Sequence, residues 1–238
     1  MFTVFITSGL FLGWSLGAND AAHVFGTAVG TRMISVRKAA ILCSIFVILG
    51  AVISGAGATE TLGELGSVNA IAGAFVVALA AAITVYWLTV LGYPVSTTQA
   101  IVGGIIGWDL FAGALIDYGS LVKIVASWVV SPILAAIVSV ILYKLIARSV
   151  MRASIHMFKL DALTRYGLII AGVAGSYSLG ANNIANVVGV FIPVSPFQDL
   201  NVLGLFKLKA AQQLFFIGAV AIAVGTLTYG KKVMLTVG

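Results

Sequence analysis

The sequence predicts an all-α polytopic membrane protein with inverted-topology repeats and broken or re-entrant helices. Three observations support this prediction: the composition, the length of the apolar segments, and a polar motif that occurs twice. Of the 238 residues, 61% are hydrophobic and 8% are charged, whereas soluble domains carry about 25% charged residues. The composition therefore excludes a soluble enzyme, a nucleic-acid-binding protein and a disordered regulator.

Several apolar segments are long enough to cross a membrane, which requires about 20 mostly apolar residues. These segments are 3–29, 39–58, 70–92, 121–147, 166–190 and 210–230. A further apolar stretch, 94–117, is interrupted by Pro94, by several glycines and by Asp109. Irregular backbone is tolerated at membrane depth only where protein or a water-filled cavity shelters it. We therefore expect 94–117 to be broken or re-entrant.

Basic residues predict which loops face the inside of the cell. The loop 31–38 and the block 144–165 are rich in Lys and Arg, so both are expected inside, together with Lys231 and Lys232. The acidic residues expected outside are Glu60, Glu64, Asp109 and Asp117. Lys207 and Lys209 fall on the outer side and do not fit this pattern.

A polar motif near the N-terminus recurs later in the chain. Residues 15–20, Ser-Leu-Gly-Ala-Asn-Asp, match residues 178–183, Ser-Leu-Gly-Ala-Asn-Asn. The predicted crossings place the first copy in a helix entered from outside and the second in a helix entered from inside. The sequence therefore predicts an inverted repeat, in which substrate and ion sites lie near the midplane where the copies meet.

This repeat divides the chain into three parts. Residues 1–150 form the first repeat, which includes the broken segment 94–117, and residues 151–165 form a basic cytoplasmic connector. Residues 166–238 begin the second repeat, which is shorter than the first. We therefore expect this chain to be the N-terminal portion of a longer transporter.

Asp20 is an acidic residue deep within a predicted span, where a carboxylate costs roughly 2.5–3.5 kcal/mol. No Lys or Arg is predicted at that depth, so a bound cation or proton would offset the cost; a neutral Asp hydrogen-bonded between helices is the alternative. Nearby amides could supply oxygen ligands for a hard cation such as sodium, or could only bond across helices. These amides belong to Asn19, Asn182, Asn183 and Asn186. The small residues around both motif copies would let the helices break there.

A second constellation, Pro94-Val95-Ser96-Thr97-Thr98-Gln99, has the pattern of a capped helix start. Free N–H groups, the positive end of the helix dipole and three clustered hydroxyls would together bind a tetrahedral oxyanion. An ordinary capped helix has the same sequence pattern. Its place inside a broken membrane segment favours the anion site.

With these motifs, the chain resembles the inorganic phosphate transporter family of sodium- or proton-coupled symporters. Gly-Ala-Asn-Asp at 17–20, its echo at 180–183 and Pro-Val-Ser-Thr-Thr at 94–98 carry the resemblance. The sequence departs from the family pattern at His23, at Gln99 and at Asn183, where the family often has Asn, His and Asp. Late in the chain the family has a second Pro-x-Ser-Thr element, and here Pro-Val-Ser-Pro stands at 193–196.

The resemblance implies a secondary active transporter that imports inorganic phosphate with sodium by alternating access, and not an enzyme. The implied phosphate-binding residues are Asp20, Ser96, Thr97, Thr98, Gln99 and Asn183. The implied sodium ligands are Ser15, Asn19, Asp20, Ser178, Asn182, Asn183 and Asn186. The alternatives are a proton-coupled symporter for phosphate or sulfate, and a passive anion channel.

The expected partners and location follow from the same reading. The partners are phosphate, sodium or a proton, the lipid bilayer, the C-terminal remainder of the transporter and a second copy in a homodimer. Neither a cofactor other than the co-transported ion nor a nucleic acid is expected. The expected location is the plasma or inner membrane, in a multi-pass arrangement.

Overall fold

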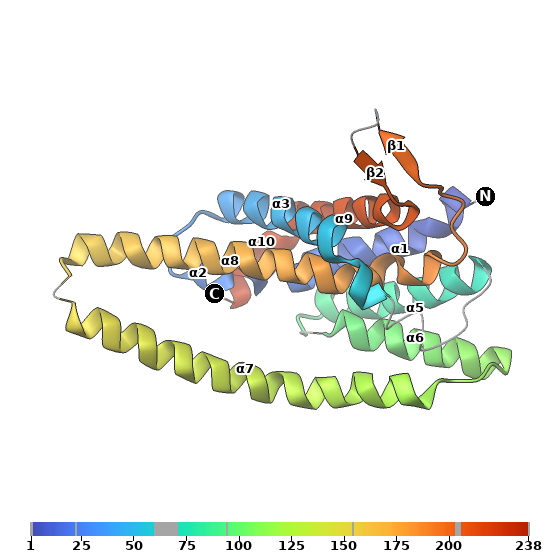
Figure 1. The fold of residues 1–238 in the computed structure, drawn as a ribbon, viewed down its shortest axis with the longest axis horizontal. Helices are drawn as coiled ribbons and strands as arrows, with labels where there is room; N and C mark the ends of the chain where they lie inside the picture. The colour runs from blue at the N-terminus through green and yellow to red at the C-terminus, as the bar shows by residue number, and fades with distance from the viewer. Residues whose placement is uncertain are drawn as a thin grey trace.

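The computed structural model describes residues 2–21, 23–59, 71–93, 95–153, 155–202 and 206–237. Its long helices run roughly parallel to one axis of the molecule (Figure 1). The first half contains α1 (Phe2–Leu16), the π-helical turn η1 (Gly17–Ala21), α2 (Gly26–Gly30), α3 (Val36–Ser54), α5 (Ile71–Val90) and α6 (Thr97–Ala112). The second half contains α7 (Tyr118–Arg152), α8 (Met157–Val188), the 3-10 turn η2 (Gly189–Phe191), β1 (Leu200–Val202), β2 (Phe206–Leu208), α9 (Ala210–Thr228) and α10 (Gly230–Val237).

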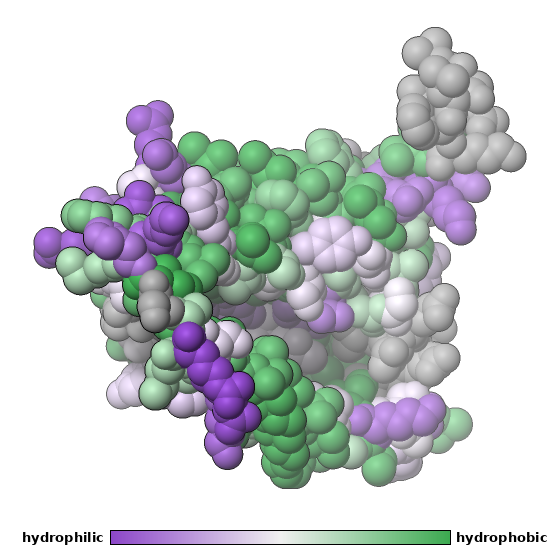
Figure 2. Space-filling model, turned by 60° about the vertical axis from the view of Figure 1, so that its left-hand side comes forward, coloured by the Kyte–Doolittle hydropathy of each residue, from purple (hydrophilic) through white to green (hydrophobic). Residues whose placement is uncertain are grey.

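The prediction of a helical, multi-pass membrane protein is confirmed. Among the described residues, five helical segments are long and apolar enough to span a membrane: Phe2–Ala21, α3, α5, α7 and α9. The expected span 166–190 lies in α8, which has 32 residues but is not among those five. Hydrophilic residues gather at the ends of the molecule and hydrophobic residues form the surface between them (Figure 2).

The helices alternate in direction along the chain (Figure 1). Helix α1 runs opposite to α8, and α3 runs opposite to α9. Buried side chains where these four helices meet form one hydrophobic core, which includes Leu16, Val47, Ile184 and Ile222. A second core joins α1 to α5 and α6 through residues such as Leu12, Ala78 and Ile105. Strands β1 and β2 form a small antiparallel hairpin that precedes α9.

The segment expected to be broken, 94–117, contains the short helix α6; Pro94 lies outside the described residues. Helices α5 and α6 form a hairpin whose turn lies near the middle of the molecule's long axis (Figure 1). The 16 residues of α6 rise about 24 Å, less than the roughly 30 Å of a bilayer's hydrocarbon core. Helix α6 is therefore shorter than a full membrane crossing, as expected of a broken segment.

Helix α7 stands apart from the other helices (Figure 1). Only 6% of its apolar window is buried, compared with 39–56% for the other four candidate spans. Asp117 caps its first turn by accepting hydrogen bonds from the Gly119 amide at 2.9 Å and the Ser120 hydroxyl at 2.7 Å. These bonds favour the charged carboxylate and hold the pKa of Asp117 below its usual range.

Two helix crossings are so close that only glycine fits at them. A Cβ atom on Gly17 would overlap the Ile222 carbonyl oxygen of α9, and one on Gly225 would overlap the carbonyl oxygen of Trp14. The crossing of α3 with α8 has the same construction. There a Cβ atom on Gly180 or on Gly50 would overlap a carbonyl oxygen of the facing helix.

The two crossings correspond residue by residue. Gly17 and Gly180 are 163 positions apart (180 − 17), which is the offset of the repeated motif, and Gly50 and Gly225 are 175 apart (225 − 50). The crossing between α1 and α9 thus has its counterpart in the crossing between α8 and α3. This correspondence, with the opposite directions of the paired helices, supports the predicted inverted repeat.

These crossings yield a stability prediction. We expect Gly180→Ala to destabilise the protein by about 1–3 kcal/mol, because overpacking against backbone forces the helices apart. Gly167→Ala in the same helix is the matched control, since a Cβ there meets nothing within 4 Å. Thermal unfolding of the purified protein measures the difference, and equal midpoints for the two variants would contradict the close crossing.

Candidate functional site

The first motif interrupts α1. The α-helix ends at Leu16, and Gly17–Ala21 form a π-helical turn that contains Asp20. Single π-helical turns within α-helices are frequent at functional sites because they redirect side chains and free backbone carbonyls. The Thr226 hydroxyl of α9 donates to the carbonyl of Gly17 at 3.1 Å. This break is the one that the small residues of the motif led us to expect.

Asp20 meets the N-terminus of α6. The Thr97 hydroxyl donates to Asp20 Oδ2 at 2.9 Å, and Thr97 is the first residue of α6 and is buried. Ser96 caps this helix by accepting a hydrogen bond from the Gln99 amide at 3.3 Å. Since the N-terminus of a helix carries partial positive charge, this position stabilises a carboxylate. The first motif and the hydroxyl-rich segment, 77 residues apart, therefore form one site.

The next hydroxyl of α6 contacts the second motif. Asn186 of α8 donates through Nδ2 to Thr98 Oγ1 at 2.9 Å and to Asn183 Oδ1 at 2.9 Å. Asn183 in turn donates to the Leu179 carbonyl at 3.3 Å. Consecutive threonines at the start of α6 thus contact one copy of the repeated motif each.

Other candidate residues lie outside this contact. Asn19 donates to the Thr89 hydroxyl of α5 at 2.8 Å, and its Oδ1 lies 3.1 Å from His23 Nε2. Asn182 is exposed and donates to Ser178, also exposed, at 3.4 Å. Ser96 and Gln99 are exposed as well, at the cap of α6.

Ser15 is buried, and its hydroxyl has no hydrogen-bond partner among the described residues. It lies beside a small pocket that is also lined by Trp14, Tyr86 and Thr89.

The expectation that both motif copies break their helices is wrong for the second copy. Helix α8 continues from Met157 to Val188 without interruption, through Gly180 and Ala181. Gly180 instead serves the close crossing with α3. A small residue permits a break but equally permits a close helix contact, and here the contact prevails.

The structure adds polar residues that the sequence did not single out. Thr89 holds Asn19, and Thr226 satisfies the carbonyl at the π-helical turn. Both threonines lie in largely apolar helices, and no pattern in the sequence indicated these contacts. Asp109, expected on the outer side, is fully buried in α6, and its carboxylate oxygens have no hydrogen-bond partner among the described residues.

The charges around Asp20 are also sparse. The salt bridge found among the described residues joins Asp161 to Arg165 on the exposed start of α8 and does not involve Asp20. Asp20 accepts a hydrogen bond from the neutral hydroxyl of Thr97. The site is thus a half-buried carboxylate beside hydroxyls and amides, an arrangement that suits binding of an anion together with a cation or proton.

A bundle of membrane-spanning helices with a broken helix and polar groups inside it defines a membrane transport protein. A model of the phosphate transporter family matches residues 16–161 and 156–238. The chain therefore belongs to the phosphate transporter family, and it is a multi-pass membrane transporter and not an enzyme.

Individual relatives agree with this assignment. A protein of Pyrococcus furiosus described as a phosphate permease is 26% identical, over 98% of this chain and 74% of its own length. The chloroplastic inorganic phosphate transporter 2-1 of Arabidopsis thaliana is 37% identical, over 61% of this chain and 27% of its own. A solved structure described as the sodium-dependent phosphate transporter has a TM-score of 0.78 and 26% identity, over 99% of this chain and 77% of its own.

The contact between Thr97 and Asp20 is directly testable. We expect Thr97→Val to lower phosphate uptake by proteoliposomes roughly tenfold or more, because a hydrogen bond to a charged group contributes about 1.5–3 kcal/mol. Thr84→Val is the matched control, since Thr84 lies on exposed α5 surface and bonds only its own helix at Ala80. If both variants transport phosphate at the wild-type rate, the contact has no part in the site.

Proposed function

We propose that this protein imports inorganic phosphate together with sodium ions by alternating access. The observation that carries the proposal is the bridge at the start of α6, where Thr97 contacts Asp20 and Thr98 contacts Asn186. A ligand at this helix N-terminus would touch elements of both repeats. Its presence would therefore affect how the repeats move relative to each other.

The electrostatics of the site favour coupling to a cation. Phosphate and the Asp20 carboxylate are both negative, and both would lie near the N-terminus of α6. A cation between them would offset this repulsion. Entry of an anion into a negative cell also costs about 2.3 kcal/mol per charge per 100 mV, and each sodium ion moving inward recovers that amount. The solved structure that this chain resembles is described as sodium-dependent, which supports sodium as the cation.

The residues proposed for each ligand follow from this arrangement. Phosphate would bind Asp20 through the shared cation or proton, and would bind Ser96, Thr97, Thr98, Gln99 and Asn183 directly. Sodium would bind Asp20 and Asn183 with further oxygens from Ser15, Asn19, Ser178, Asn182 and Asn186. Ser178 and Asn182 would have to turn inward, since they are exposed here.

The domain division and the partners are proposals of the same kind. Residues 1–150 and 166–238 would be the two repeats, joined by the basic connector 151–165. The direction reversal between α1 and α8 supports this division. A homodimer and a contribution from further transporter sequence remain predictions.

A second candidate, proton-coupled phosphate transport, has one observation in its favour. Asp20 has no basic partner among the described residues, so a proton could neutralise it as well as sodium could. Both candidates require Asp20 to be occupied by a positive species during transport. They differ in which gradient drives uptake.

Phosphate uptake by proteoliposomes, with sodium and pH gradients imposed separately, tests the proposal. We expect the wild type to respond to the sodium gradient, and Asp20→Asn to lose most of that response because the amide carries no charge. Asp161→Asn is the control, because Asp161 is an exposed carboxylate that bonds Arg165.

The outcomes separate the candidates. Uptake driven by the pH gradient without sodium would show that the coupled ion is a proton and not sodium. Uptake that ignores both gradients would indicate a passive anion channel. Unchanged sodium dependence in Asp20→Asn would remove Asp20 from the site.

A further inference from the structure

Two cavities flank the first turn of α3, and the residues that line them do not include Asp20, Thr97 or Asn186. The first, about 420 Å³, lies between the α2–α3 loop, α3 and α8. The second, about 650 Å³, lies between α3, α9 and α10. Ser35 and Ile41 line both cavities, so the two openings share one helix start.

Each cavity combines apolar walls with basic side chains. Lys38 and Arg165 line the first, and Arg37 and Lys231 line the second. No Asp or Glu is among the described residues that line either cavity. These positive charges can therefore pair with an anion from outside the chain.

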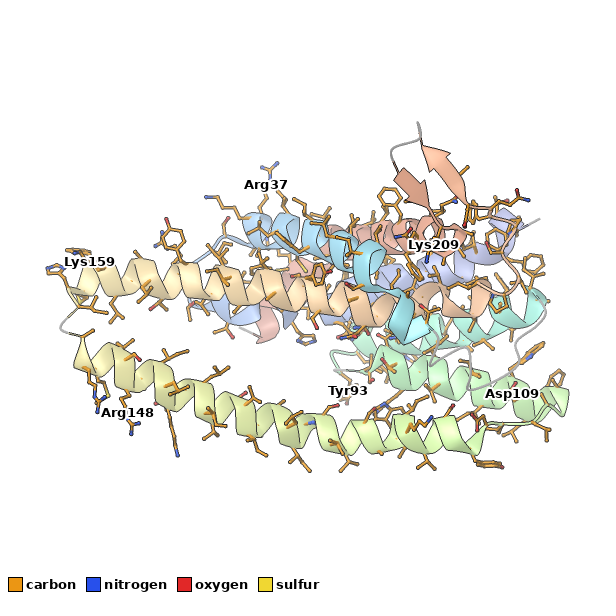
Figure 3. The ribbon with its side chains drawn as sticks, viewed as in Figure 1. Arg37, Tyr93, Asp109, Arg148, Lys159 and Lys209 are labelled. Carbon is orange, nitrogen blue, oxygen red and sulfur yellow. The ribbon has the colours of Figure 1, made fainter. Side chains whose placement is uncertain are left out.

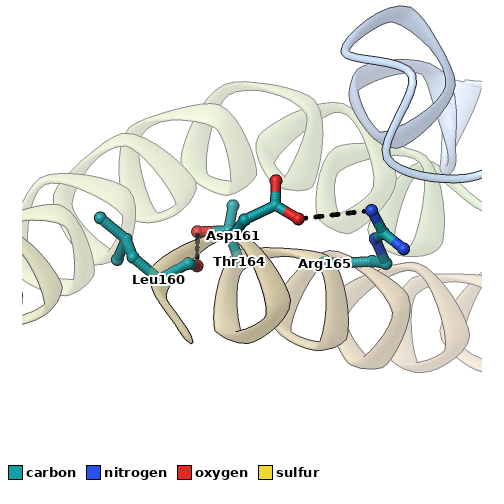
Figure 4. A network of polar contacts seen from close by, with 4 residues as sticks. All are labelled: Leu160, Asp161, Thr164 and Arg165. Carbon is teal, nitrogen blue, oxygen red and sulfur yellow. Dashed lines mark hydrogen bonds and ion pairs between the residues drawn. The ribbon is translucent and has the colours of Figure 1, made fainter. Parts of the chain in front are cut away.

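Arg165 already has one partner. Its guanidinium lies 3.3 Å from the carboxylate of Asp161, one turn earlier in α8, and both side chains are about half exposed (Figure 4). Exposed pairs of this kind contribute little to stability. The remaining N–H donors of the guanidinium are free to bind a second oxyanion.

The start of α3 adds to the positive potential. Ser35 precedes the helix in an extended conformation, and its side chain makes no capping hydrogen bond. The first turn of this 19-residue helix carries N–H groups that have no partner within the helix. Together with the helix dipole, they favour an anion at this position.

Exposed apolar tracks lead away from the cavities along the membrane-facing surface. On α3, Ile41, Ile45, Leu49 and Ile53 recur every four residues and are 41–65% exposed. On α9, Val220, Val224 and Leu227 form a second exposed track that ends at the larger cavity. Both tracks present apolar side chains of the kind that contact acyl chains.

We propose that the two cavities form a binding site for an anionic phospholipid of the inner leaflet. The phosphodiester would lie at the first turn of α3, between Arg37, Lys38, Arg165 and Lys231. The acyl chains would lie along the tracks on α3 and α9. Arg37, Arg148 and Lys159 lie toward the same end of the molecule (Figure 3), and an excess of basic residues marks the cytoplasmic side.

The apolar walls distinguish this ligand from free phosphate. An inorganic phosphate ion gains nothing from Ile41, Leu42, Ile169 or Leu227, which line the cavities beside the charges. A phospholipid uses both kinds of surface at once. The lipid would bridge α3 to α8 on one side and to α9 on the other.

Native mass spectrometry of the detergent-purified protein with added phosphatidylglycerol tests this proposal. We expect retained phosphatidylglycerol and much less retained phosphatidylcholine. Arg37→Gln combined with Lys231→Gln should weaken phosphatidylglycerol binding about 25-fold, from about fivefold per charge. Lys144→Gln combined with Arg148→Gln in α7 removes the same charge near the same side but outside both cavities, and should change binding less than twofold.

Four results would overturn the proposal. Equal loss in the α7 variant would indicate general surface attraction. Equal retention of phosphatidylcholine would indicate an apolar cavity without charge recognition. Displacement of phosphatidylglycerol by millimolar inorganic phosphate, or equal binding of its dihexanoyl form, would indicate a site for the free anion.

Discussion

The contact between the Asp20 carboxylate and the start of α6 is the interaction that joins the two polar motifs of the first half of the chain. At this contact α1 changes to a π-helical turn at Gly17, and a new helix, α6, begins at Thr97. Neither change is tolerated in lipid unless other protein groups satisfy the freed backbone. The Thr226 hydroxyl donates to the Gly17 carbonyl at the first break, and the Ser96 hydroxyl accepts from the Gln99 amide at the second. The hydroxyls around Asp20 therefore have a structural role as well as the proposed role in binding.

The close glycine crossings bring helix backbones together at two places. They join α1 to α9 and α8 to α3, and the glycines of one crossing correspond in position to those of the other. Small residues let helix backbones approach closely, and within a membrane this van der Waals packing stabilises the association of helices. The equivalence of the two crossings agrees with the proposed division of the chain into two repeats.

The sequence was sufficient for the fold class and for both motifs of the central contact, but not for the contact itself or its local form. Composition and segment length placed the helices, because a chain with 8% charged residues has few ways to satisfy its backbone other than helices in a membrane. The motifs at 17–20 and 96–99 were identified by their chemistry, and the structure brings Asp20 and Thr97 together. The continuity of α8 could not be predicted, because Gly180 is equally suited to a break or a crossing and only the facing carbonyl decides. The burial of Asp109 and the roles of Thr89 and Thr226 depend on neighbours distant in sequence, which no local pattern indicates.

The two motif copies are equivalent in position but not in charge, and this difference bears on how an anion is bound. Asp20 brings one negative charge to the start of α6, whereas Asn183 at the corresponding position of the second copy brings none. Asn183 instead accepts from Asn186, which also donates to Thr98. Both N–H donors of Asn186 are thus engaged within the protein, whereas Asn183 uses one of its two for the Leu179 carbonyl and keeps the other. Because only the first copy carries a carboxylate, an anion at the start of α6 would meet a negative charge from one motif copy and a neutral amide from the other. The asymmetry therefore places the electrostatic cost of binding an anion on the side of Asp20, where the Thr97 hydroxyl and the helix N-terminus partly offset it.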